Sequence, residues 1–151
     1  MKNQFIPLLF TLIASAASVA LAHEGIELGP NKGRIVEFST DETLHGEVTL
    51  KDGKLHIALL DKDMKPVKPT TQKLTATAGT REMPQKLEIA RDAAGFTLST
   101  PGEGEWLILQ YKAAPDAKPI TARIHFDTAT CAPCGNSEWR CACADVASKK
   151  P

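Results

Sequence analysis

Four cysteines, which are all that the chain contains, lie close together near its carboxyl end. They form the pattern C-x2-C-x6-C-x-C, at Cys131, Cys134, Cys141 and Cys143. Proline and glycine between them favour turns, so the four sulfurs are predicted to gather around one centre. Thiolates at such spacings bind Zn²⁺ or Cu(I), while thiols in an oxidising compartment form disulfides. This cysteine cluster is therefore either a metal site or a set of disulfides.

Three chemistries are open to the cysteine cluster. Four thiolates in a tetrahedral arrangement would hold Zn²⁺ or Cu(I). Disulfides would leave no metal, and they would run crosswise from Cys131 or Cys134 to the later pair, because a bridge between Cys141 and Cys143 would be strained. The third chemistry is thiol–disulfide exchange at the C-x-x-C of Cys131 and Cys134. That activity normally needs the first cysteine at a helix N-terminus in a βαβ fold.

Two histidines are candidates for further metal ligands. Cleavage of the chain after Ala22 would make His23 the first residue, where its α-amine and imidazole together can chelate a Cu(II)-like ion. The alternative is a frayed terminus in which His23 has no role. His125 is the internal histidine nearest to the cysteines in sequence, and it is the better candidate for an extra ligand there.

The amino-terminal stretch has the three parts of a secretory signal peptide. Lys2 gives a positive start, an apolar run covers Phe5–Ala14, and small residues lead up to Ala22. The apolar run is too short and wrongly flanked for a membrane span, although an uncleaved anchor is the alternative. We expect residues 1–22 to be a signal peptide that is removed, leaving a periplasmic or secreted protein with no membrane attachment.

Charge and motif content exclude several functions. Removal of 22 of the 151 residues leaves 129, enough for one domain, and takes one lysine from the 18 basic residues but none of the 18 acidic ones. The formal net charge is then −1, without a basic run or stripe, so nucleic acid is a poor partner. No nucleophile elbow, H-E-x-x-H motif or phosphate loop occurs. We predict that the protein is not an enzyme.

From Arg34 to Phe126, short runs rich in Val, Ile, Leu, Phe and Thr alternate with Gly, Pro and Asp. The predicted strands are 34–38, 45–50, 54–60, 73–78, 86–90, 96–99, 106–112 and 120–126. Their period is two, and no stretch has a helical period, so we predict an all-β, immunoglobulin-like β-sandwich. This domain covers residues 23–127, and the change of composition marks residues 128–151 as a short cysteine-rich C-terminal tail.

The clearest hairpin is the pair of alternating runs around Asp52-Gly53. A two-residue turn sets Thr49 opposite His56, and His45 then lies on the same polar face as His56 but about 13 Å along the strand. The two histidines are too far apart to share an ion, and each is expected to be solvated. The opposite, core-facing side is predicted to carry Val48, Leu50, Leu55, Ile57 and Leu59.

Three stretches of the domain together resemble a known family. They are Gly29-Pro-Asn-Lys-Gly-Arg34, His45-Gly-Glu-Val48 and Leu59-Leu-Asp-Lys-Asp-Met-Lys-Pro-Val67. Placed soon after an export signal and a His-Glu pair, they are similar to the N-terminal soluble region of periplasmic adaptor subunits of heavy-metal efflux pumps. The resemblance covers residues 23–67. It implies a periplasmic β-domain associated with metal handling, with an efflux system or another periplasmic protein as partner.

The chain departs from the family in two ways. Only His23 stands where the family has a histidine-rich run, and Lys32 replaces a glycine of the G-P-N-G-G-R motif. The helical hairpin and lipoyl-like parts of a pump adaptor are missing from this sequence, so it is not a complete adaptor. The cysteine cluster lies outside the resemblance. Taken together, the sequence predicts an exported metal-binding accessory protein, with a disulfide-stapled interaction module as the alternative and a thiol redox protein as the third reading.

Overall fold

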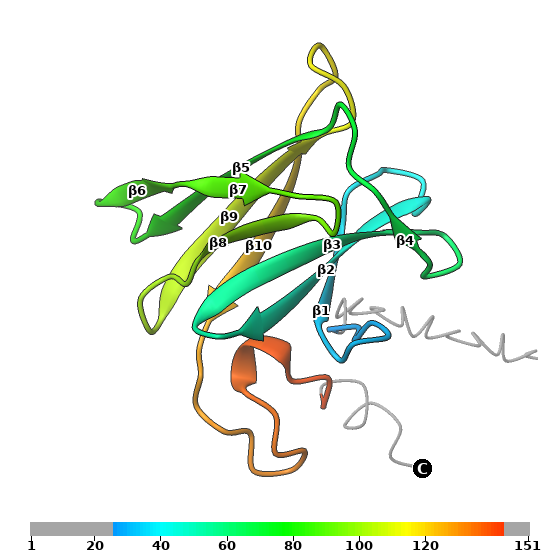
Figure 1. The fold of residues 1–151 in the computed structure, drawn as a ribbon. Helices are drawn as coiled ribbons and strands as arrows, with labels where there is room; N and C mark the ends of the chain where they lie inside the picture. Colours follow the sequence, from blue (N-terminus) through cyan, green and yellow to red (C-terminus); the bar gives the residue numbers. More distant parts are fainter. Residues whose placement is uncertain (1–25, 144–151) are drawn as a thin grey trace, which may run out of the picture.

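The structure is a computed structural model that describes residues 26–143. Two antiparallel sheets face each other as layers, and the tail lies below them in the view of Figure 1. Sheet A has the order β1-β2-β3-β8-β7, with β4 beside β3, and sheet B has the order β10-β9-β5-β6. The all-β sandwich with a cysteine-rich C-terminal region confirms the predicted fold class. The predicted signal peptide and His23 lie outside the described residues.

The strands of sheet A are β1 (Arg34–Glu37), β2 (Leu44–Lys51), β3 (Lys54–Asp61), β4 (Pro66–Val67), β7 (Ile89–Arg91) and β8 (Phe96–Ser99). Those of sheet B are β5 (Lys73–Gly79), β6 (Pro84–Leu87), β9 (Glu105–Lys112) and β10 (Ile120–Phe126). A single short 3₁₀ helix, η1 (Glu138–Arg140), follows in the described part of the tail. No helix within residues 26–143 is long and apolar enough to cross a membrane.

The predicted strand 86–90 is wrong as a single element. The chain leaves sheet B after Leu87 and enters sheet A at Ile89, so β6 pairs with β5 while β7 pairs with β8. Alternation continues through the crossing, because a change of partner leaves the backbone extended. The two-residue strand β4 was not predicted, since it is too short to show a period.

The register predicted for the β2–β3 hairpin is confirmed residue by residue. Asp52 and Gly53 both have positive φ, 51° and 71°, as the two-residue turn requires. The predicted core positions are buried except Leu50, which is 44% exposed. Leu50 lies next to the turn, beyond Val48, the last residue of β2 that pairs with β1. At that end of the sheet its side chain is left in solvent.

The polar face of this hairpin is partly buried, contrary to the expectation from the sequence. His45 is 6% exposed, and its Nδ1 lies 2.9 Å from Glu37 Oε1 on the neighbouring strand. Glu47 is 1% exposed. His56 is half-buried, with Nδ1 3.2 Å from the Thr97 hydroxyl. The expectation of a solvated side chain was wrong for His45 and holds only in part for His56, because neighbouring strands of the same sheet place Glu37 beside His45 and Thr97 beside His56.

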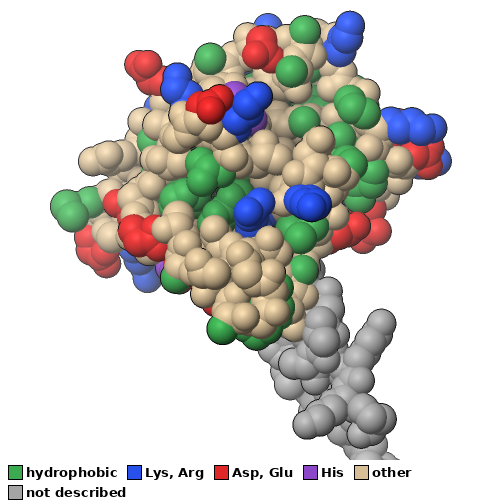
Figure 2. All heavy atoms as spheres, turned by 60° about the horizontal axis from the view of Figure 1, so that its bottom comes forward, with side chains coloured by type: hydrophobic (Ala, Val, Ile, Leu, Met, Phe, Trp, Pro, Cys, Tyr) green, Lys and Arg blue, Asp and Glu red, His purple; other side chains and the backbone are tan. Residues whose placement is uncertain are grey.

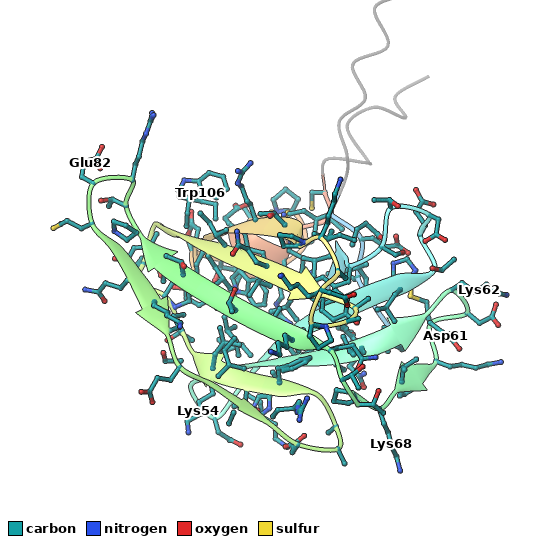
Figure 3. All side chains as sticks on the ribbon, turned by 90° about the horizontal axis from the view of Figure 1, so that it is seen from above. Lys54, Asp61, Lys62, Lys68, Glu82 and Trp106 are labelled. Carbon is teal, nitrogen blue, oxygen red and sulfur yellow. The ribbon has the colours of Figure 1, made fainter. Side chains whose placement is uncertain are left out.

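The core between the sheets extends into the tail. It is built from aliphatic side chains and from Phe38 and Tyr111, whose rings stack at 4.5 Å. Trp139, from η1, is 2% exposed and belongs to the same apolar cluster, packed on Phe126. Figure 3 shows the two layers from above, with Trp106 on the outer side of sheet B. The tail therefore shares the core of the β-domain.

Candidate metal centre

Backbone hydrogen bonds fold the tail back onto the end of β10. The Trp139 N–H donates to the Asp127 carbonyl and the Glu138 N–H to the Ala129 carbonyl, each at 2.9 Å. The Trp139 ring then lies 5.6 Å, centroid to centroid, from the ring of Phe126. These contacts anchor the segment that immediately precedes Cys141.

A tight local turn positions the first two cysteines. The Cys131 N–H donates to the Asn136 carbonyl, and the Gly135 N–H donates to the Cys131 carbonyl, both at 2.8 Å. Gly135 has φ of +72°, a left-handed conformation that glycine adopts without a Cβ clash. The turn reverses the chain directly after Cys134 and so directs both thiols to the same side.

The second pair of cysteines follows η1. Cys141 terminates this short helix, and its N–H donates to the Glu138 carbonyl at 3.1 Å. The Cys143 N–H lies 3.5 Å from the Cys141 sulfur. The Cys-x-Cys spacing thus presents two sulfurs from one short extended segment.

The four sulfurs all lie within 4.8 Å of one another. The Cys131–Cys141, Cys134–Cys141 and Cys131–Cys143 sulfur pairs are separated by 3.1, 3.7 and 3.8 Å. Four thiolates around Zn²⁺ at the usual Zn–S distance of about 2.3 Å would stand about 3.8 Å apart. A disulfide needs about 2.05 Å, and all four cysteines are free thiols here. The arrangement is compatible with a bound metal ion.

Burial and protonation differ among the four thiols. Cys131 is 5% exposed, Cys134 is exposed, and Cys141 and Cys143 are intermediate. The pKa of Cys131 is raised to about 11, first by its hydrogen bond with the Cys141 thiol and then by burial. The backbone N–H of Asn136 and then the Cys143 thiol lower the pKa of Cys134 to about 7. Hydrogen bonds with Cys134 and Cys141 raise the pKa of Cys143.

The histidines are placed apart from this group. Among the described residues, the set of His, Cys, Asp and Glu side chains that could share one ion consists of the four cysteines. His125 is exposed on β10, where its ring lies 5.2 Å from that of Trp106. His23, the other predicted ligand, is outside the described residues. The four cysteines are thus the predicted site residues that the structure brings together.

The thiol redox interpretation finds no support in the surroundings of the C-x-x-C. Cys131 begins a turn closed by Gly135 rather than a helix, and η1 starts only at Glu138. An activated thiol of that class usually sits at a helix N-terminus. The fold around it is all-β, so the βαβ framework of the class is missing from residues 26–143.

Two polar residues near the site were not predicted from the sequence. The Arg34 Nη1 donates to the Trp139 carbonyl at 2.8 Å, across 105 positions of sequence. Burial lowers the pKa of the Arg34 guanidinium from its usual value. The second residue is Glu47, whose carboxylate accepts backbone N–H groups of the turn that leads to Arg34. Contacts between residues so far apart in sequence leave no local signal, and Glu47 is itself 14 and 16 positions from Gly33 and Asn31.

No protein-family model, curated protein or solved structure matches the chain. The class of protein is therefore defined by its own fold and site, as a two-sheet β-sandwich that carries a cluster of four thiols at one end.

Proposed function

We propose that the protein is an exported accessory protein that binds one Zn²⁺ or Cu(I) ion at the cysteine cluster and takes part in handling that metal. The observation that supports this most directly is the convergence of four sulfurs within 4.8 Å on a tail that is packed against the β-domain. Soft thiolate sulfur favours Cu(I) and Zn²⁺ over Mg²⁺ or Ca²⁺. The role is binding and not catalysis.

The compartment and partner belong to the same proposal. The signal-like residues 1–22 support export to the periplasm or beyond. The resemblance of residues 23–67 to heavy-metal efflux adaptors supports an efflux system, or another periplasmic protein, as the partner. In an oxidising compartment a bound metal would also protect the thiols from disulfide formation.

A disulfide-stapled interaction module without metal is the second candidate. It is favoured by two separations that join the first cysteine pair to the second, 3.7 Å for Cys134–Cys141 and 3.8 Å for Cys131–Cys143. Two crosswise disulfides would therefore need only a small approach of the sulfurs. The positions of the sulfurs suit both a metal ion and two disulfides, so a chemical test must distinguish the two candidate functions.

Metal analysis and thiol counting on one periplasmic preparation separate the candidates. We expect one Zn²⁺ or Cu(I) per chain and four thiols that react after the metal is removed by a chelator. The double variant Cys141→Ser, Cys143→Ser should be isolated without the metal and keep only weak binding by its two remaining thiols, whereas His125→Ala should keep the metal as a matched control. Metal should also be released as pH falls, because protons compete for the thiolates. If no metal is found and the four cysteines react only after a reductant is added, the metal function is wrong and the disulfide module takes its place.

A further inference from the structure

Glu47 is a buried carboxylate wrapped by the turn of residues 29–33. Its Oε1 accepts the backbone N–H groups of Asn31 at 2.7 Å and Gly33 at 3.0 Å, and its Oε2 accepts the Asn31 side-chain amide at 2.8 Å. A buried carboxylate is costly unless its oxygens are satisfied, and here three donors of one turn satisfy it. Glu47 thus fixes the conformation of this turn.

The glycines of the turn allow it to close around Glu47. A Cβ atom at Gly29 would lie 2.7 Å from the Glu47 carboxylate, and one at Gly33 would lie 2.7 Å from the Glu47 Cγ. Both contacts are shorter than real Cβ atoms tolerate. Lys32, at the position where the related motif has glycine, adopts a positive φ of 58°. The glycine-rich motif is therefore shaped by its packing on one buried acid.

This turn ends at Arg34, which reaches the cysteine-bearing tail. The Arg34 Nη1 bonds to the Trp139 carbonyl, and Arg140 Nη1 lies 3.4 Å from the Lys32 carbonyl in the turn itself. Trp139 and Arg140 directly precede Cys141. In Figure 1 the start of β1 lies beside the tail, and Figure 2 shows basic side chains on this end of the molecule. The turn and the tail are thus joined by contacts in both directions.

We infer that Arg34, held by the Glu47-centred turn, is a positioning residue for the metal centre and fixes the segment that carries Cys141 and Cys143 against the β-domain. This inference rests on the proposed metal function. The first cysteine pair is set by its own turn, but the second pair is presented by a segment whose order depends on contacts with the body. If that segment is mobile before the metal binds, the entropy cost of ordering it makes metal binding weaker.

The test measures Co²⁺ and Zn²⁺ affinity of the full-length mature protein by competition with a chelator. Hydrogen-bonded partners of metal ligands typically alter affinity 10–100-fold. For Arg34→Ala, one contact further away, we expect about a tenfold loss. Glu47→Gln should weaken binding in the same direction, and Arg34→Lys should recover part of the loss. Arg123→Ala, which removes an exposed arginine from β10, is the matched control and should bind as wild type.

A coupling measurement separates positioning from a general loss of stability. Arg34→Ala should not weaken the residual Co²⁺ binding of the Cys141→Ser, Cys143→Ser variant, because the segment that Arg34 holds no longer supplies ligands. An equal loss in both backgrounds, or wild-type affinity in Arg34→Ala, overturns the inference. Wild-type protein that binds none of Co²⁺, Zn²⁺ and Cu(I) after reduction would instead overturn the proposed function. Arg34→Lys keeps the test valid if Arg34→Ala does not fold.

Discussion

Trp139 joins the cysteine-bearing tail to the core of the β-domain. Its ring is buried against Phe126, and its backbone carbonyl accepts the Arg34 guanidinium. Its Nε1–H has no hydrogen-bond partner among the described residues. The ring therefore stabilises the fold by apolar burial, in spite of a polar group that it leaves unsatisfied. Because its ring is buried in the core, Trp139 is not an exposed recognition residue.

Trp139→Ala should lower the free energy of unfolding by about 3–5 kcal/mol, the range for removing a large aromatic side chain from a core. Trp139→Phe should lower it much less, because most of the ring stays and the unsatisfied N–H is removed. Urea unfolding of the metal-free protein, followed by circular dichroism, measures both. Equal stability of Trp139→Ala and wild type would show that the tail is not packed on the core.

At the scale of elements, the two faces of the β2–β3 hairpin have different roles. Its core face carries Ile57 and its neighbours into the sandwich, while Glu47 on the other face holds the turn before Arg34. Exact pairing matters here because a shift by one residue would exchange the two faces. The Asp52-Gly53 turn determines that pairing.

The hairpin makes a prediction that compares adjacent residues of β3. Ile57→Ala should cost about 2–5 kcal/mol of stability, because a buried branched side chain leaves a cavity. His56→Ala should cost only about 0.5–1.5 kcal/mol, the usual net value of a hydrogen bond such as the one to Thr97. Denaturant midpoints with unchanged slopes give both values. A larger loss for His56→Ala would contradict the observed register.

At the scale of the whole molecule, the tail closes one end of the sandwich. It lies where β10 ends and β1 begins, so the cysteine-bearing tail is next to strands from both sheets (Figure 1). Ile26, the first described residue, lines shallow hollows at this same end together with Arg34.

The proposed export predicts a defined amino terminus for the mature protein. Cleavage after Ala22 should leave His23 as the first residue, because Ala20 and Ala22 supply the small side chains that the cleavage site needs. Amino-terminal sequencing of protein from the periplasm measures this directly, with cytoplasmic protein as the control. Any other first residue would remove the proposed amino-terminal Cu(II) chelate of His23.

Local sequence determined the strands, the hairpin and the gathering of the cysteines. Alternation shows which residues face a core because successive side chains of a strand point to opposite sides. The Asp52-Gly53 dipeptide specifies a two-residue turn, and turn residues between cysteines bring their sulfurs together. All of these are short-range effects, which depend on neighbours in the chain.

Tertiary structure alone decided how the site is supported. The burial of His45 and Glu47 depends on neighbouring segments that are distant in sequence, whereas alternation placed His45 on a face that was expected to be solvated. The change of sheet between Leu87 and Ile89 depends on which strands stand nearby. The bond from Arg34 to the Trp139 carbonyl joins positions 105 residues apart. Such contacts form only when the two sheets have packed, because nothing in the local backbone specifies the distant partner.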